Sequence, residues 1–167
     1  MISSDLFSTS KKYLSHHQWE LINDVQTILS RLQKLDHIND YSFIVSPVAK
    51  AYEGFLKDFF LDTGIIDQAT YHSDRFRVGK TLNPSLRYKR FSIFQKLTDL
   101  HQRGEELAET LWDAWKFGRN EIFHYFPDNL KKLNRDEAEE RITLILKAII
   151  NAGNFSQDHL ASQKNLL

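Results

Sequence analysis

The chain has 167 residues, of which 41% are hydrophobic, so it is long enough to form one domain around a single core. It contains no cysteine, which excludes disulfide bonds, thiolate metal sites and thiol nucleophiles. Its 22 basic and 22 acidic residues balance, so net charge gives no general attraction to nucleic acids, and its 6 glycines and 3 prolines are too few for a turn-rich all-β fold.

Apolar residues in the first third of the chain recur at helical spacing. They predict an amphipathic helix over residues 11–36. Ser46 as N-cap and Pro47 at the first helical position predict a second helix that runs to about Asp62 and stops at Gly64. The apolar positions of these two helices are Trp19, Ile22, Val25, Ile28, Leu29, Leu32, Leu35, Val48, Ala51, Tyr52, Phe55, Phe59 and Phe60.

The middle of the chain is predicted to contain a long loop and two further helices. Residues 64–83 show no sustained period and are expected to form the loop. Pro84 predicts the start of a third helix that ends near Gly104. A fourth helix is expected from Glu105 to about Tyr125. The apolar positions of these helices are Leu86, Phe91, Phe94, Leu97, Leu100, Leu107, Leu111, Trp115 and Ile122.

The last part of the chain is predicted to form a fifth helix. Asn134 and Glu137 resemble a capping box at its start, and Gly153 is expected to end it before a frayed polar tail over 154–167. Its apolar positions are Ala138, Ile142, Ile145, Leu146 and Ile149. We therefore expect a single all-α domain over all 167 residues, a bundle of about five helices with its core at about 11–153.

The sequence gives no sign of membrane insertion. No uninterrupted apolar stretch approaches the roughly 20 residues that a bilayer span needs. The first residues also lack a basic region followed by an apolar run. We expect a cytoplasmic protein without membrane contact.

Three chemically active side chains lie close together in the sequence, just before the helix-breaking Pro127: Arg119, Asn120 and His124. At about 100° per residue on an α-helix, Asn120 and His124 lie about 40° apart and share a face, whereas Arg119 lies about 140° from His124. The long arginine side chain, a distorted last turn or a second copy of the chain would have to complete the cluster.

These groups suit metal-independent RNA cleavage, in which a ribose 2′-hydroxyl attacks the adjacent phosphorus and leaves a 2′,3′-cyclic phosphate and a 5′-hydroxyl. Histidine exchanges protons near neutral pH, so His124 would be the general base or acid. Arg119 would bind the phosphate oxygens and stabilise the charge at phosphorus, and Asn120 would orient the histidine or the phosphate. A solvated arginine and histidine at a helix end are the alternative, and spacing alone does not exclude it.

The order Arg119-Asn120-x-x-x-His124, at the end of the fourth helix of a small all-α domain, resembles the signature motif of the HEPN superfamily. The resemblance covers about residues 44–150. It implies an HEPN-like helical bundle and metal-independent endoribonuclease activity, frequently that of a toxin or an antiviral defence effector. It also implies a homodimer in which two motifs face each other across one cleft.

Within the superfamily, the segment 46–57 followed by the late motif is similar to the catalytic domain of RnlA-type (RNase LS) toxins. In those toxins a basic residue, and a glutamate three positions later, support the arginine and the histidine from an earlier helix. Lys50 and Glu53 match that spacing, but lysine replaces the expected arginine and cannot bind phosphate bidentately. An ordinary surface ion pair between these two residues is the alternative.

HepT-type toxins are the next most similar group. Their motif usually continues with a tyrosine two residues after the histidine, and their antitoxin modifies that tyrosine. Here Phe126 holds this position and the tyrosine is Tyr125, so control by modification in this manner is not expected. The resemblance to toxins implies an antitoxin protein as a partner.

A basic segment lies over residues 75–90, which contain no acidic residue. With aromatic residues interleaved, such a segment can follow a phosphate backbone and stack bases, so we predict RNA contacts there; a solvated surface is the alternative. The basic residues are Arg75, Arg77, Lys80, Arg87, Lys89 and Arg90, and the nearby aromatic residues are Tyr71, Phe76, Tyr88 and Phe91.

No metal or cofactor is expected, because the seven histidines are scattered and no glycine-rich phosphate loop is present. The predicted partner is RNA as substrate. A second hypothesis is a non-catalytic HEPN-type helical module that binds a protein partner or nucleic acid. Such a module would bind without ever producing cyclic-phosphate ends.

Overall fold

The computed structural model describes residues 2–32, 38–124 and 126–164, with side chains up to Asp158. Within these ranges the chain forms eight α-helices and no strand, which confirms the all-α class, although the number of helices exceeds the predicted five. The helices are α1 (Ser4–Lys11), α2 (His16–Arg31), α3 (Ser42–Asp62), α4 (Gln68–Tyr71), α5 (Val78–Thr81), α6 (Ile93–Leu100), α7 (Gly104–Trp115) and α8 (Arg135–Lys164). Short helical turns lie between these helices: η2 (Pro84–Leu86), the π-helix η3 (Lys116–Asn120) and η4 (Pro127–Asn129).

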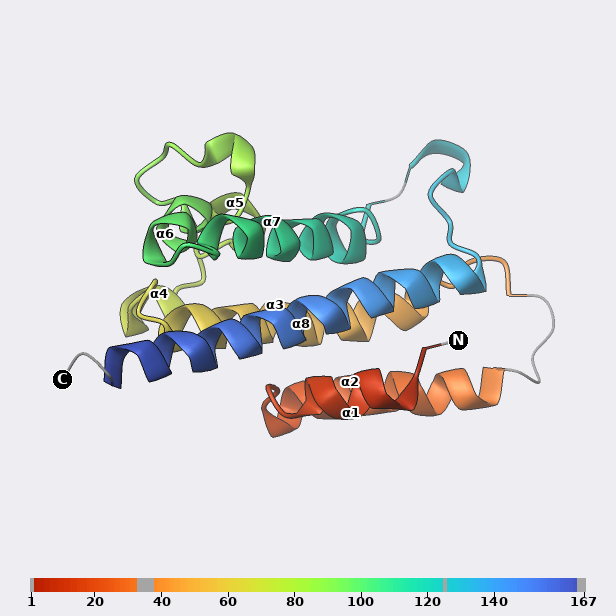
Figure 1. Ribbon diagram of the computed structural model, residues 1–167. Helices are drawn as coiled ribbons and strands as arrows, with labels where there is room; N and C mark the ends of the chain where they lie inside the picture. The colour runs from red at the N-terminus through yellow and green to blue at the C-terminus, as the bar shows by residue number, and fades with distance from the viewer. Residues whose placement is uncertain (1, 33–37, 125, 165–167) are drawn as a thin grey trace.

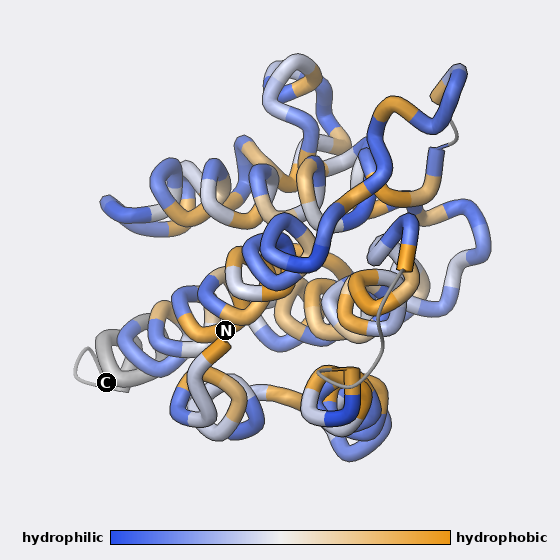
Figure 2. The backbone as a smooth tube through the Cα atoms, turned by 90° about the vertical axis from the view of Figure 1, so that its right-hand side faces the viewer, coloured by the Kyte–Doolittle hydropathy of each residue, from blue (hydrophilic) through white to orange (hydrophobic). Residues whose placement is uncertain are grey.

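The helices are arranged in layers around α3 and α8, which lie side by side in the middle of the molecule (Figure 1). Helices α1 and α2 cover one side of this pair, and α6 and α7 cover the other. Figure 2 shows the same layers from a second direction, with hydrophobic and hydrophilic residues alternating along each helix. The amphipathic helices thus bury their apolar sides between the layers.

Helix α3 contributes the largest share of buried aromatic side chains. Tyr52, Phe55, Phe59 and Phe60 are all buried, and Tyr52 has no exposed surface. Its hydroxyl donates a hydrogen bond of 3.0 Å to the carbonyl oxygen of Leu111, so the buried polar atom is satisfied. Burial raises the pKa of the Tyr52 phenol well above its ordinary value. The bond fixes α3 against α7, which carries the candidate site at its end.

The N-terminal region differs from the single helix predicted over 11–36. Two helices, α1 and α2, are separated by a break before Ser15. Ser15 and Gln18 form a capping box that starts α2, because each accepts a hydrogen bond from the other's backbone N–H. The predicted apolar positions of α2 are largely buried, but Ile28 is exposed. Leu35 lies outside the described residues.

The second predicted helix, α3, begins one turn earlier than expected. It starts at Ser42, so Ser46 is not its N-cap and Pro47 lies inside the helix. The extra turn is favoured because Ile44 and Val45 become fully buried. The predicted stop is confirmed: Gly64 follows the helix with a φ of 71°, a left-handed conformation that suits glycine.

Residues 64–104 were predicted as a loop and one long helix, and both predictions are partly wrong. The segment 64–83 contains α4 and α5, which are held down by buried apolar side chains. Pro84 begins only the short η2, and α6 starts later, where the Ser92 side chain accepts a hydrogen bond from the backbone of Gln95. The buried residues of the first segment are Ile65, Ile66, Phe76, Val78 and Leu82.

The capping box of the last helix is confirmed. The Asn134 and Glu137 side chains each accept a hydrogen bond from the other's backbone N–H, at 2.9 and 2.8 Å. Gly153 does not end α8, which continues to Lys164, so the predicted frayed tail is helical over most of its length. A Cβ at Gly153 would lie 2.2 Å from Tyr13 Cδ1, so glycine allows this close contact with α1's end. None of the described helices is long and apolar enough to cross a bilayer.

A close contact between α5 and α7 generates a stability prediction. A Cβ at Gly79 would lie 2.3 Å from Nε1 of the Trp115 indole, which is rigid and buried. We expect Gly79→Ala to lower the free energy of unfolding by about 1–3 kcal/mol, measured by urea denaturation. Gly54→Ala is the matched control, since its new Cβ would lie no closer than 3.2 Å to any atom, the nearest being Nε2 of the Gln18 side chain. Equal stability of the two variants would show that Gly79 does not pack this closely against Trp115.

Candidate functional site

Arg119 lies on a π-helical turn, η3, that replaces the end of the fourth predicted helix. The N–H of Glu121 donates to the carbonyl of Lys116, five residues back. The regular α-helix therefore stops at Trp115, and the prediction that it runs to about Tyr125 is wrong. Isolated π-turns are rare and frequently occur at functional sites.

Gly118 allows this turn to lie against α8. It is buried, and a Cβ there would lie 2.6 Å from Cδ1 of Ile145. A larger residue would push the turn away from the helix. With Gly118 facing inward, the neighbouring Arg119 is left at the edge of the core, with about a third of its side chain exposed.

The guanidinium of Arg119 is held by two aromatic rings and one carboxylate. Its Cζ lies 5.1 Å from the ring centre of Trp115 and 5.2 Å from that of Phe123. Its Nη2 lies 3.8 Å from Oε2 of Glu53 on α3. Both rings are within the range of a cation–π interaction. The cation is therefore oriented before any ligand arrives.

A pocket of about 460 Å³ opens beside this arginine. Lys50, Glu53 and Arg119 all line it, so the structure brings together three of the five predicted catalytic residues. The other lining residues are Leu21, Ser46, Pro47, Ala49 and Phe123. Two cations and one carboxylate thus face a largely apolar cavity.

The structure places Asn120 and His124 outside this pocket lining. Asn120 is the exposed last residue of η3, and His124 lies in an exposed bend. No hydrogen bond or ion pair of the His124 side chain is present among the described residues. Because Glu121 to His124 form turns, the α-helical angles that put Asn120 and His124 on one face do not apply.

The segment that carries His124 is anchored at both ends. Before it, the Glu121 carboxylate lies 3.6 Å from Nζ of Lys131 and 3.7 Å from Nη2 of Arg141. After it, the backbone N–H of Leu133 and the side-chain amide of Asn129 donate hydrogen bonds to the Asp40 carboxylate, the first at 3.2 Å. The same carboxylate accepts a hydrogen bond of 2.9 Å from the N–H of Ser42, at the start of α3. These contacts connect the loop to α8 and to the start of α3.

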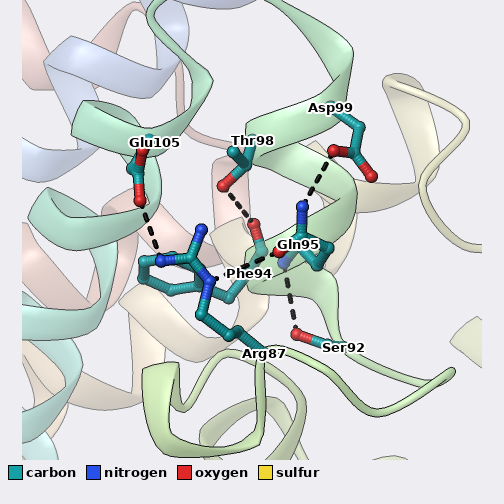
Figure 3. A network of polar contacts seen from close by, with 7 residues as sticks. All are labelled: Arg87, Ser92, Phe94, Gln95, Thr98, Asp99 and Glu105. Carbon is teal, nitrogen blue, oxygen red and sulfur yellow. Dashed lines mark hydrogen bonds and ion pairs between the residues drawn. The ribbon is translucent and has the colours of Figure 1, made fainter.

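Three of the six predicted RNA-binding cations are engaged within the chain. The Arg87 guanidinium lies over the ring of Phe94 and forms a 2.9 Å ion pair with Glu105 (Figure 3). Arg77 donates to the backbone carbonyls of Asp74 and Phe76, and Lys80 lies 5.1 Å from the ring centre of Phe91.

The other three cations, Arg75, Lys89 and Arg90, are exposed, and the described residues give their side chains no ion pair. Tyr88 beside them is 90% exposed. Phe76 is buried and is not available for stacking, whereas Tyr71 is half-buried and its hydroxyl donates to Asp58 at 2.7 Å. RNA contact by this basic segment stays a prediction, and Arg75, Lys89 and Arg90 are its exposed cations without an ion pair among the described residues.

Among the described residues, no group of three or more His, Asp or Glu side chains is arranged to hold a metal ion.

Several residues that shape the site were missed from the sequence. Trp115 and Phe123 flank Arg119 at four-residue spacing, a cation–aromatic pattern that is present in the sequence. Glu121 and Asp40 contact residues distant in the chain, and no local pattern identifies such contacts.

Comparison of the chain with protein-family models, curated proteins and solved structures finds no match. The resemblance to the HEPN superfamily therefore stays a prediction from the sequence.

The anchor at Asp40 generates a pH-dependent prediction. Partial burial raises the pKa of the Asp40 carboxyl, but hydrogen bonds from Ser42, Asn129 and Leu133 outweigh it and lower the pKa to about 2. Its stabilising contribution is therefore present above about pH 4 and is lost as the pH falls towards 2. We expect Asp40→Asn to lower the free energy of unfolding by on the order of 1–2 kcal/mol near neutral pH.

Urea denaturation across this pH range checks the prediction. The difference between Asp40→Asn and the unmodified chain should shrink towards zero near pH 2, since the carboxyl is then increasingly protonated. Asp24→Asn, which removes an exposed carboxylate of α2, is the control. A difference that is independent of pH would contradict the role of the carboxylate charge.

Proposed function

We propose that this protein is a metal-independent endoribonuclease of the HEPN type, which cleaves RNA by attack of the 2′-hydroxyl on the adjacent phosphorus. One observation carries the proposal. Lys50 and Glu53, which were selected with Arg119 by resemblance to RnlA-type toxins, line the same pocket as Arg119. They come from α3, far from η3 in the sequence.

In this proposal Arg119 binds the scissile phosphate. Its guanidinium presents planar N–H donors that match two phosphate oxygens, and it stabilises the charge that builds at phosphorus. The rings of Trp115 and Phe123 fix its plane, and Glu53 aligns it from across the pocket. Lys50, exposed at the pocket edge, adds a second positive charge without bidentate geometry.

His124 transfers the protons in this proposal, and Asn120 orients the imidazole or the phosphate. Both are exposed, next to the pocket in sequence but not part of its lining. A homodimer, which the resemblance implies, would supply a second histidine facing the first pocket. The resemblance also supports a protein antitoxin as partner and a role in toxin–antitoxin or antiviral defence.

The catalytic assignment is tested by substitution. We expect Arg119→Ala to reduce the rate of RNA cleavage by about 10²- to 10³-fold, and His124→Ala by about 10²- to 10⁴-fold. Arg119→Lys should recover only part of the rate, because lysine lacks the planar fork. The rate is measured on labelled single-stranded RNA, with and without a chelator.

The matched controls are Arg31→Ala and His72→Ala, which remove an exposed arginine and an exposed histidine elsewhere in the chain. Both variants should cleave RNA at the unmodified rate. Full activity in Arg119→Ala or His124→Ala, or loss of activity with chelator, would contradict the mechanism. Binding of RNA without any cleavage by the unmodified chain would instead favour the non-catalytic module.

The basic segment makes a separate prediction about RNA affinity. We expect Arg90→Ala to reduce the slope of log affinity against log salt by about 0.7, since it removes one exposed phosphate contact to a single strand. Arg87→Ala should instead lower the urea midpoint, because it breaks the ion pair with Glu105 and the contact with Phe94. A lower urea midpoint for Arg90→Ala, with a reduced salt slope for Arg87→Ala, would contradict this division of the cations into exposed and engaged.

A further inference from the structure

The pocket beside Arg119 has two chemically different halves. Arg119, Lys50 and Glu53 form a charged half, whereas the rest of the lining is mainly apolar. The apolar half consists of Leu21, Pro47, Ala49 and Phe123.

We infer that the apolar half is a nucleobase-binding subsite, in which the ring of Phe123 stacks on the base of the nucleotide whose phosphate Arg119 holds. The identification of the ligand as RNA rests on the proposed function. The subsite makes Phe123 a substrate-positioning residue, which the sequence pattern did not select.

The exposure of Phe123 supports this inference. Half of its surface is exposed, although it lines the pocket and contacts Arg119. One part of the ring contacts the Arg119 guanidinium, and the exposed part remains available for stacking. Stacking of a base on an aromatic ring needs no hydrogen-bond readout, because every base has a π-face.

The combination of charge and shape favours a nucleotide over a purely apolar ligand. A nucleotide has an anionic phosphate and a flat, weakly polar base, and the pocket offers a cation and an aromatic ring in direct contact. Glu53 does not exclude the phosphate, because its charge is opposed by Arg119 at 3.8 Å. The volume of about 460 Å³ is within the range of about 300–1,000 Å³ for small-ligand pockets.

The subsite has a consequence for the substrate. A base can enter a pocket of this kind only when it is unstacked and unpaired. The pocket therefore selects single-stranded RNA or loops over duplex RNA, and it does so beside the residue that would bind the scissile phosphate.

The experiment measures RNA affinity with cleavage removed. In the His124→Ala chain, the Kd for short fluorescent homopolymers of U, C and A is measured by anisotropy, together with that for an abasic ribose-phosphate strand of equal length. We expect an added Phe123→Ala to weaken binding of the base-containing strands by about 5- to 100-fold. Phe123→Trp should retain the affinity, and Phe123→Leu should not, since leucine supplies apolar area without a π-face.

Two controls separate stacking from other effects. The abasic strand should bind equally well to the chains with and without Phe123→Ala, because it has no base to stack. Phe43→Ala removes an aromatic ring of similar exposure on α3 that does not line the pocket, and it should leave every Kd unchanged. Urea midpoints and sedimentation show that each variant keeps its fold and its oligomeric state.

The inference and the proposed function fail separately. The inferred base subsite is overturned if the Phe123→Leu chain binds RNA as tightly as the chain with Phe123, or if Phe123→Ala weakens the binding of abasic strands equally. It is also overturned if RNA affinity falls only in variants for which sedimentation shows loss of a dimer. Cleavage by the unmodified chain combined with no effect of Phe123→Ala on Kd removes the subsite and leaves the function. Phe123-dependent binding by a chain that never cleaves RNA supports the subsite and contradicts the function.

Discussion

The close packing of the π-turn η3 against α8 determines the geometry of the whole site. Gly118 lies buried against Ile145, in a space that no Cβ fits without movement of that side chain. With this residue fixed inward, the turn presents Arg119 toward α3 and places the following segment outside the regular helix. The pocket, the contact with Glu53 and the exposed position of His124 all follow from the point at which the α-helix ends.

The interaction energies indicate which contacts hold Arg119 in place. An ion pair between side chains that are each about a third exposed, at 3.8 Å, contributes only about 0–1 kcal/mol. Contacts of a guanidinium with aromatic rings contribute about 0.5–2 kcal/mol each, and Arg119 makes two. The rings therefore hold the cation and the carboxylate directs it. This arrangement leaves the guanidinium free to exchange its weak partner for a phosphate, which is a stronger acceptor.

Local patterns predicted the all-α class, the capping box at Asn134, the stop at Gly64 and most of the buried positions, because these depend on neighbouring residues. The break before Ser15, the early start of α3 and the continuation of α8 through Gly153 depend on packing between helices, which spacing does not report. The same limit holds for the site. Lys50, Glu53 and Arg119 were selected by resemblance and lie in one pocket, whereas the angular argument for Asn120 and His124 failed because it assumed a regular α-helix.

The central claim, that this pocket cleaves RNA through the ribose 2′-hydroxyl, is tested most directly by analysis of the ends of RNA incubated with the purified chain. An all-ribose strand is compared with a strand of the same sequence in which every ribose is 2′-deoxy. The account predicts 2′,3′-cyclic phosphate and 5′-hydroxyl ends from the first strand and no cleavage of the second. Products with 3′-hydroxyl and 5′-phosphate ends, or cleavage of the deoxy strand, would contradict it.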